Sequence, residues 1–423
     1  MGQLHREGFI IGSQETRRSP EVKPGLFYGY IIVLAAFFIM LVMFGVYNTF
    51  GIFSKPVLTE FGWTRAITSG AFSLSWILYG LLGIVMGRLT DRLGPRIVLT
   101  FCGFLVGLGY LLMSQITAVW QLYLFYGVII GTGMCGFFVP LTSTAARWFV
   151  KRRSMMSGIV LSGMGIGTLI MSPVTNWLIS TYDWRQSYTI LGSVVLVLVI
   201  LAAQPLRRDP AQMRQVPYGE NAGEEQGLGT SGLSLREAIY TGQFWLVSAQ
   251  FFCLGFCIFT ILVHIAPHAI EVGLSAASAA NILATIGGCS IIGKVILGSA
   301  ADRIGNRLVF LIGFFLMAAI LFWIAKSGEV WELYLFAVIF GVAYGGCAAS
   351  EAPLVAALFG LRFHGLILGV INFGFTIGAA VGPFLAGYIF DISESYEVAF
   401  LVCTAISVIG IIFTALIKPI KVS

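Results

Sequence analysis

The chain has 423 residues, of which 58% are hydrophobic and only 10% are charged. Soluble domains carry about one quarter charged residues, so too few polar side chains are present to cover a water-facing surface of this size. The composition excludes a soluble enzyme, a nucleic-acid-binding protein and a disordered chain, and it predicts an all-α membrane protein. The net charge of +6 therefore matters through the position of the basic residues, because Lys and Arg collect in cytoplasmic loops.

Twelve apolar stretches are long enough to cross the hydrocarbon core, which takes roughly 20 helical residues. They cover 27–52, 66–87, 97–115, 121–147, 154–180, 187–205, 242–267, 278–300, 308–325, 332–358, 364–389 and 397–417. We expect a cytoplasmic tail 1–26, a first six-helix bundle 27–205, a cytoplasmic linker 206–238 and a second six-helix bundle 239–423. The run Gly227–Gly232 within the linker is typical of a flexible connection.

The basic residues predict the orientation of the chain in the membrane. If the N-terminus lies inside, 20 of the 25 Lys and Arg fall in inner segments and four in outer segments, while Lys294 falls within a span. This asymmetry indicates that both termini face the cytoplasm and that the protein lies in the cytoplasmic membrane.

An internal repeat relates the two halves at an offset of 211 residues. The first copy of a motif contains Gly87, Asp91, Arg92, Gly94 and Arg96, and the second contains Gly298, Asp302, Arg303, Gly305 and Arg307. Three glycines of span five, at positions 158, 163 and 167, recur in span eleven at 369, 374 and 378. Parallel six-helix repeats around a central linker are the layout of a transporter whose substrate binds between two pseudo-symmetric bundles.

Both copies of the motif fall at the inner end of the membrane, after spans two and eight. Their pattern resembles the cytoplasmic-loop signature of the major facilitator superfamily. The resemblance implies the fold of that superfamily and a role for the motif in gating and orienting the two bundles. Glycine also permits close helix approach, and Asp91 and Asp302 stand where a neighbouring helix N-terminus would favour an anion.

The junction of spans four and five carries a second resemblance. Trp148 and Phe149 precede the basic triplet Lys151, Arg152 and Arg153, and small residues follow at regular spacing. This segment looks like the span-five signature of the monocarboxylate transporter family, and the oxalate/formate antiporters have a similar one. The family's span-one signature contains an acid, whereas this chain has Phe27-Tyr-Gly-Tyr30, a version typical of bacterial members. We therefore expect a bacterial or archaeal member of this group.

Lys294 is the strongest candidate for a binding residue. An ionisable group inside the hydrocarbon is expensive and marks a functional site by default, and the related transporters carry an arginine at this place that receives the substrate carboxylate. The alternative is a lysine that snorkels to the inner surface, which lies about 12 Å away at Asp302. Span eleven lacks the second lysine of the oxalate-type antiporters, which favours a monocarboxylate over a dianion.

Other polar side chains at depth are few. Glu351 either titrates during coupling or forms a structural ion pair with Arg362 or Lys294, and His264 is either linked to a proton or simply packed. Further candidates to contact the substrate are Tyr126, Tyr344, Asn281, Asn372 and, for its methyl side, Phe373.

The sequence thus predicts a proton-coupled symporter of small monocarboxylates, such as lactate or pyruvate, and not an enzyme. The coupling candidates are Lys294, whose bound proton a substrate anion would favour, Glu351 and His264. An anion exchanger of the oxalate/formate type and a ligand sensor that transports nothing remain the alternatives. We expect no cofactor, no metal site and no nucleic-acid partner, and we expect a monomer to suffice for transport.

Overall fold

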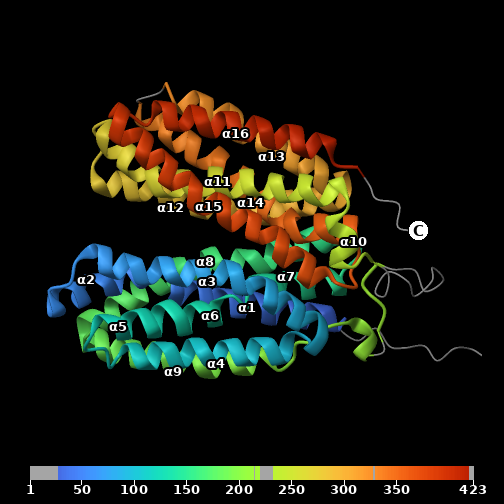
Figure 1. Ribbon diagram of the computed structural model, residues 1–423, viewed down its shortest axis with the longest axis horizontal. Coiled ribbons are helices and arrows are strands. Elements are labelled where there is room, and N and C mark those ends of the chain that lie inside the picture. The colour runs from blue at the N-terminus through green and yellow to red at the C-terminus, as the bar shows by residue number, and fades with distance from the viewer. Residues whose placement is uncertain (1–26, 214, 220–231, 327–328, 419–423) are drawn as a thin grey trace, which may run out of the picture.

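The computed structural model describes residues 27–213, 215–219, 232–326 and 329–418, and these form helices arranged in two layers (Figure 1). Twelve helical segments in this part of the chain are long and apolar enough to cross a membrane. The prediction of an all-α membrane protein with two six-helix bundles is therefore confirmed. The predicted tail 1–26 and most of Gly227–Gly232 lie outside the described residues.

The first bundle contains spans one to six. Its elements are α1 (Tyr28–Tyr47), α2 (Phe50–Phe61), α3 (Arg65–Leu93), α4 (Pro95–Met113), α5 (Val119–Leu122), the π-helix η1 (Tyr123–Ile130), α6 (Gly131–Met134), α7 (Phe138–Trp148), α8 (Arg153–Tyr182) and α9 (Trp184–Ala203). Span one is α1 together with α2, and span four runs from α5 to α7. The predicted end of span one at residue 52 is nine residues short, because Lys55, Thr59 and Glu60 lower the hydropathy of a segment that is still helical.

The second bundle follows the linker elements η2 (Pro210–Met213) and α10 (Leu235–Ile239). Its six helices are α11 (Gly242–Glu271), α12 (Ala276–Ile304), α13 (Asn306–Ile324), α14 (Val330–Phe359), α15 (His364–Ser393) and α16 (Glu397–Leu416). Each bundle has its own apolar core. The bundles meet along two seams, at which α3 packs against α15 and α8 packs against α12.

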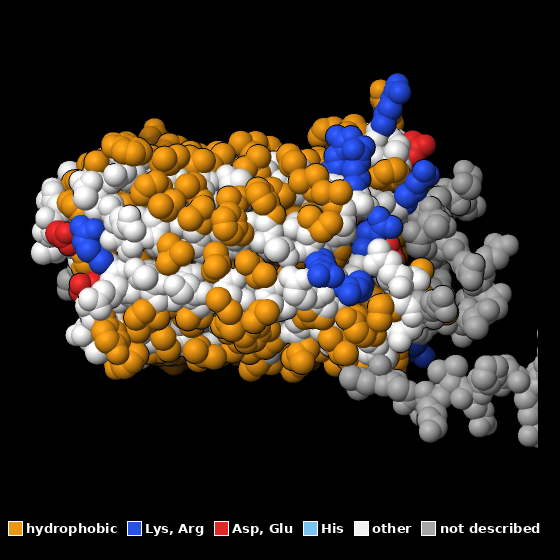
Figure 2. Space-filling view, turned by 90° about the horizontal axis from the view of Figure 1, so that it is seen from below, with side chains coloured by type: hydrophobic (Ala, Val, Ile, Leu, Met, Phe, Trp, Pro, Cys, Tyr) orange, Lys and Arg blue, Asp and Glu red, His pale blue; other side chains and the backbone are white. Residues whose placement is uncertain are grey.

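Most of the basic side chains on the face shown in Figure 2 gather at one end of the molecule. The described chain also begins and ends there, since Phe27 packs against Trp148 and the amide of Lys418 donates to Gln243 at the start of α11. We call this the basic end. On the same face, many apolar side chains and almost no charged ones lie between the basic end and the opposite end, as a lipid-facing belt requires.

Both motifs are helical rather than part of loops. The helices α3 and α12 continue through Asp91 and Asp302 and end only at Gly94 and Gly305, where φ is 84° and 92°. This left-handed backbone suits glycine, which has no Cβ to clash. The prediction that span two ends at Gly87 and span eight at residue 300 is therefore too short. Each motif begins on the last turns of one helix and ends, at Arg96 or Arg307, on the first turn of the next.

The linker is tied to both bundles at positions related by the repeat. Tyr218 pairs with Phe149 in a short parallel bridge, and its amide donates to Trp148 over 3.0 Å. Gly232 pairs with Gly360, which stands 211 residues after Phe149, and the amide of Leu233 donates to Phe359 over 2.9 Å. The described parts of the predicted flexible linker are thus anchored by backbone hydrogen bonds.

Candidate functional site

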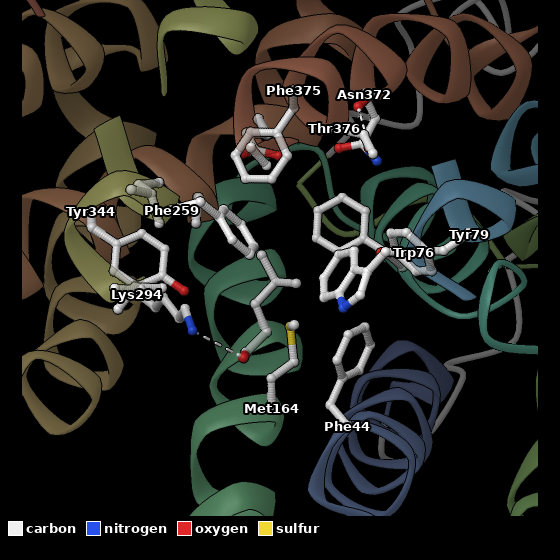
Figure 3. A pocket seen from close by; sticks show the side chains of 17 residues that line it. Phe44, Trp76, Tyr79, Met164, Phe259, Lys294, Tyr344, Asn372, Phe375 and Thr376 are labelled. Atoms are coloured by element: carbon white, nitrogen blue, oxygen red, sulfur yellow. Dashed lines mark hydrogen bonds between the residues drawn. The ribbon is translucent and has the colours of Figure 1, made fainter. Parts of the chain in front are cut away.

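A cavity of about 100 Å³ lies between the two bundles (Figure 3). Residues of α1, α3, α7 and α8 line one side of it, and residues of α11, α12, α14 and α15 line the other. Its wall is mostly apolar and aromatic. Lys294 and Glu351 are the charged residues among the described residues that line it.

Lys294 extends from α12 into this cavity and is only 3% exposed. Its ammonium donates a long hydrogen bond of 3.4 Å to the carbonyl oxygen of Leu161 on α8, in the other bundle. It also lies 5.5 Å from the centre of the Tyr344 ring. The described residues place no carboxylate within ion-pair distance of it. The side chain therefore faces the cavity and does not snorkel to the surface.

One face of α14 presents Tyr344, Ala348 and Glu351 to the cavity. These residues are spaced by four and then three positions, so they lie on the same side of a helix. Glu351 is 3% exposed, and within the described ranges it forms an ion pair with neither Lys294 nor Arg362. The cavity thus contains one acid and one base that are not directly paired.

Asn372, Phe375, Thr376 and Ala379 form the wall contributed by α15. Phe373, predicted to wall the apolar side of the substrate, does not line the cavity, and Phe375 has that place. Since each residue turns a helix by 100°, the face that holds Asn372 continues at 375, 376 and 379 rather than at 373.

An aromatic contact crosses the cavity between the bundles. Trp76 of α3 and Phe259 of α11 lie with ring centroids 5.6 Å apart in an edge-to-face arrangement, and Phe259 also contacts Phe375. Trp76 stands 15 residues before Asp91, about 22 Å farther from the basic end. Lys294 stands only about 12 Å from Asp302, so this aromatic pair covers the side of the cavity that faces the opposite end. Sequence reasoning missed Trp76 and Phe259.

Three predicted site residues lie elsewhere. Tyr126 is buried in the first bundle, where its hydroxyl donates to the carbonyl oxygen of Tyr47 over 3.3 Å. Asn281 is exposed on the first third of α12. His264 contacts the Tyr396 hydroxyl and the Pro383 carbonyl oxygen at 3.2 and 2.9 Å, both in its own bundle. None of the three is among the residues that line the cavity.

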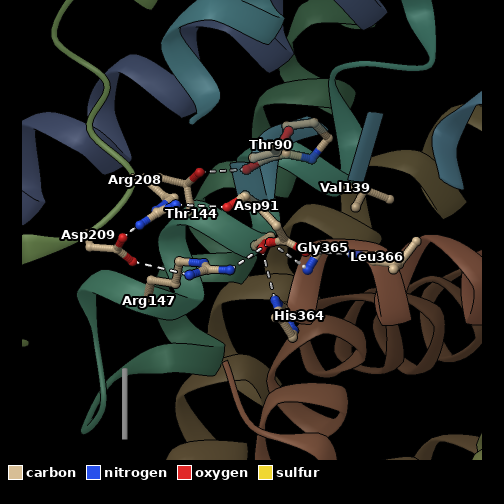
Figure 4. A network of polar contacts seen from close by, with 12 residues as sticks. Thr90, Asp91, Val139, Thr144, Arg147, Arg208, Asp209, His364, Gly365 and Leu366 are labelled. Carbon is tan, nitrogen blue, oxygen red and sulfur yellow. Dashed lines mark hydrogen bonds and ion pairs between the residues drawn. The ribbon is translucent and has the colours of Figure 1, made fainter. Parts of the chain in front are cut away.

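The first motif closes the seam between α3 and α15 at the basic end (Figure 4). The Asp91 carboxylate accepts hydrogen bonds from the amides of Gly365 and Leu366, at the N-terminus of α15, over 3.1 and 2.9 Å. It also accepts from Arg147 over 2.6 Å, and Arg147 reaches Asp209 of the linker at 3.2 Å. An anion at a helix N-terminus is favoured by the free amides and the helix dipole.

The second motif repeats this arrangement on the other seam. The Asp302 carboxylate accepts from the amides of Ser154 and Met155, at the N-terminus of α8, over 2.8 and 2.9 Å. Ser154 and Met155 stand 211 residues before Gly365 and Leu366, so each motif binds the corresponding helix of the opposite bundle. Sequence reasoning anticipated a helix N-terminus near each aspartate but did not identify which helix supplies it.

His364 adds a cross-bundle contact that the sequence did not indicate. It is fully buried at the start of α15, where Nε2 lies 3.0 Å from the carbonyl oxygen of Ala352 and Nδ1 lies 3.0 Å from the Ser143 hydroxyl of α7. A carbonyl can only accept, so Nε2 carries a proton, and in the neutral imidazole Nδ1 then accepts from the Ser143 hydroxyl. Together with Asp91 and Asp302, this contact joins the bundles at the basic end.

Among the described residues, no group of three or more His, Cys, Asp or Glu side chains stands close enough to hold a metal ion. The seven cysteines are free, and all but Cys289 are buried.

Curated proteins with similar sequences are named as monocarboxylate transporters. The chain is 27% identical to monocarboxylate transporter 13 of Rattus norvegicus over 393 residues, which covers 90% of this chain and 87% of that protein. It is also 27% identical to monocarboxylate transporter 11 of Mus musculus over 398 residues, with 90% and 86% covered. Both relatives come from animals, and the bacterial or archaeal source stays a prediction.

Solved structures show the same fold. The E. coli fucose:proton symporter FucP superposes with a TM-score of 0.70 at 15% identity, with 93% of this chain and all of that chain covered. The proton:xylose symporter XylE superposes with a TM-score of 0.72 at 14% identity, with 92% and 96% covered. The family model described as Major Facilitator Superfamily matches residues 35–296 and 269–423. The two bundles, the paired motifs and this match show that the chain belongs to the major facilitator superfamily and is a transporter related to monocarboxylate transporters.

Proposed function

We propose that the protein carries small monocarboxylates such as lactate or pyruvate, together with a proton, by alternating access. The observation that supports this most is the Lys294 ammonium, which is buried, faces both bundles and has no carboxylate partner among the described residues. A cation at this depth is expensive, and the carboxylate of a substrate would offset that cost. The names of the curated relatives support the same class of substrate.

The size and the lining of the cavity favour a small acid. Its volume of about 100 Å³ is well below the roughly 300 Å³ at which drug-sized pockets begin. In this proposal the carboxylate binds Lys294 and the apolar part of the acid packs against Phe375 and Trp76. The side chains of Asn372 and Thr376, which line the same cavity, then supply hydrogen bonds for a hydroxyl or keto group.

We assign proton coupling to Glu351, which lines the same cavity as Lys294. With Glu351 ionised and Lys294 protonated, the empty site is neutral, and the empty carrier can reorient. A bound monocarboxylate would then add one uncompensated negative charge, which is costly in a buried site. A proton on Glu351 removes that charge, so substrate and proton bind together and leave together. The alternative, in which Lys294 itself gains and loses the proton, leaves an ionised Glu351 beside the substrate.

The conformation follows from the orientation that the basic residues predict. If the basic end faces the cytoplasm, the contacts of Asp91, Asp302 and His364 close the cytoplasmic side. The substrate would then enter from outside, past the aromatic pair Trp76 and Phe259. Alternating access requires these inner contacts to break while contacts at the opposite end form.

The test is uptake of labelled lactate, pyruvate, formate and oxalate into proteoliposomes, with and without an inward proton gradient. We expect lactate or pyruvate to accumulate only when the gradient is present. Oxalate that exchanges for internal formate without any gradient would instead support the exchanger. Saturable binding without uptake of any of the four acids would support the sensor.

A further inference from the structure

A second cavity, of about 210 Å³, lies at the basic end on the seam between the bundles. Arg88 and Arg92 of α3 line it from the first bundle, and Arg362 lines it from the loop before α15 in the second. Ser234, the N-cap residue of α10, lines it from the linker. Three separate parts of the chain therefore meet around one space.

None of the three arginines forms an ion pair within the described residues, and the exposed Glu237 of α10 acts on Arg362 only at longer range. Asp91 also lines the cavity, but its two oxygens already accept from Arg147, Gly365 and Leu366. Neither Arg88, Arg92 nor Arg362 forms an ion pair or a side-chain hydrogen bond within the described ranges, and the guanidinium of Arg362 stacks on Phe363.

The arrangement concentrates positive charge where the bundles touch. Arg88 and Arg92 are four residues apart on α3, so their like charges stand on one helix face and repel each other. Closing the seam brings Arg362 to the same cavity, which adds a third positive charge. An anion in this space would relieve the repulsion.

The second half of the chain does not contain an equivalent cluster of three arginines. In the second half, Ser299 stands at the position equivalent to Arg88, and Lys151 stands at the position equivalent to Arg362. The second motif still binds its helix N-terminus through Asp302. The triple of arginines is therefore additional to the gate contact that both halves share.

We propose that this cavity binds a phosphate group, either free or in a lipid headgroup, and that the bound phosphate holds the basic end closed. Guanidinium groups match phosphate oxygens with paired, charge-assisted hydrogen bonds. Three guanidinium groups that converge from two bundles suit a tetrahedral oxyanion better than a carboxylate, which has two oxygens. Because Arg88 and Arg92 belong to one bundle and Arg362 to the other, the anion contacts all three only in the closed state, so its binding favours that state.

The test measures binding to the purified full-length chain and does not depend on transport. Labelled inorganic phosphate is titrated in neutral detergent against the wild type, Arg88→Gln and Arg362→Gln. Arg236→Gln is the matched control, because Arg236 is exposed on α10 and does not line the cavity. A second arm compares thermal unfolding of the same four proteins in nanodiscs of phosphatidylcholine, with and without phosphatidic acid.

We expect Arg88→Gln and Arg362→Gln to weaken phosphate binding about tenfold or more, and Arg236→Gln to leave it unchanged. If inorganic phosphate does not bind but phosphatidic acid raises the unfolding temperature with the same pattern among the variants, the phosphate belongs to a lipid. Arg88→Lys, which keeps the charge but loses the paired hydrogen bonds, should bind more weakly than the wild type and more tightly than Arg88→Gln. The proposal is overturned if neither probe binds, or if all three glutamine variants lose binding equally.

Discussion

A Cβ atom at Gly158 of α8 would lie 2.0 Å from the backbone carbonyl oxygen of Lys294 on α12. No side chain fits there, so glycine at 158 is what allows these helices of opposite bundles to meet. The Lys294 side chain reaches the carbonyl oxygen of Leu161 on the same helix α8. Lys294 thus takes part in closing the seam through its backbone and presents a cation to the cavity through its side chain.

Enlarging Gly158 should therefore open the basic end. Gly158→Val must move α8 and α12 apart by about 1.5 Å or more to reach an ordinary contact distance. We expect a longer distance between spin labels at Leu93 and Ile304, which are exposed at the ends of α3 and α12. Gly287→Val is the control, because a Cβ at Gly287 meets no atom within 4 Å. Equal label distances in both variants would contradict the role of Gly158.

Replacing Lys294 should remove transport while the fold is kept. Lys294→Gln loses the charge that offsets the substrate carboxylate, and the loss of a buried charge pair is worth about 3–5 kcal/mol, so uptake should fall at least about 100-fold. Lys294→Arg should keep substantial uptake, because a guanidinium also binds a carboxylate. Lys326→Gln, on an exposed lysine beside Phe322, should behave like the wild type. Normal uptake by Lys294→Gln would rule out the proposed binding role.

The proposed coupling role of Glu351 predicts how uptake depends on pH. In the wild type, uptake should rise as the external pH falls, because a protonated Glu351 is needed before the anion binds. Glu351→Gln mimics the protonated form, so it should exchange labelled for unlabelled lactate at all pH values but should not accumulate lactate when a proton gradient is applied. The exposed Glu397→Gln serves as control. If Glu351→Gln still accumulates lactate with an unchanged pH midpoint, the proton is carried elsewhere, with Lys294 the first candidate.

Asp91 should stabilise the closed seam more than Asp209 does. Asp91→Asn removes the charged partner that lies 2.6 Å from Arg147 and weakens the hydrogen bonds from two amides, whereas Asp209 contacts Arg147 at 3.2 Å and is 22% exposed. We expect Asp91→Asn to destabilise closure by about 1–3 kcal/mol and Asp209→Asn by less. The same label pair at Leu93 and Ile304 measures the closed fraction. A double variant whose change in the free energy of closure, obtained from this fraction, differs from the sum of the two single changes would show coupling through Arg147.

The fold could be predicted because its signals are strong in the sequence. Each span is an apolar run. The motif that contains Asp91 and its glycines recurs 211 residues later as the motif that contains Asp302. The predicted span boundaries were wrong where a helix end carries polar residues, such as the turns with Arg88 and Asp91 at the end of α3. Charged side chains do not end a helix when they lie at the membrane surface, so hydropathy marks the hydrocarbon region rather than the helix itself.

The site was predicted only in part, and helix phase explains the difference. Lys294 and Glu351 stood out because charge is rare at depth. Phe373 was chosen for its chemistry, although the face of Asn372 continues at Phe375 and Thr376. Trp76 and Phe259 carried no signal, because aromatic residues make up 14% of the chain and only the packing of α3 against the second bundle distinguishes these two.

The backbone hydrogen bonds that anchor the linker to each bundle bear on whether the protein could be expressed as two separate polypeptides. Tyr218 stays with the first bundle and Leu233 with the second. Two polypeptides cut between these residues would each retain their own tie and six spans. Their covalent connection would then serve mainly to keep the halves at a high effective concentration.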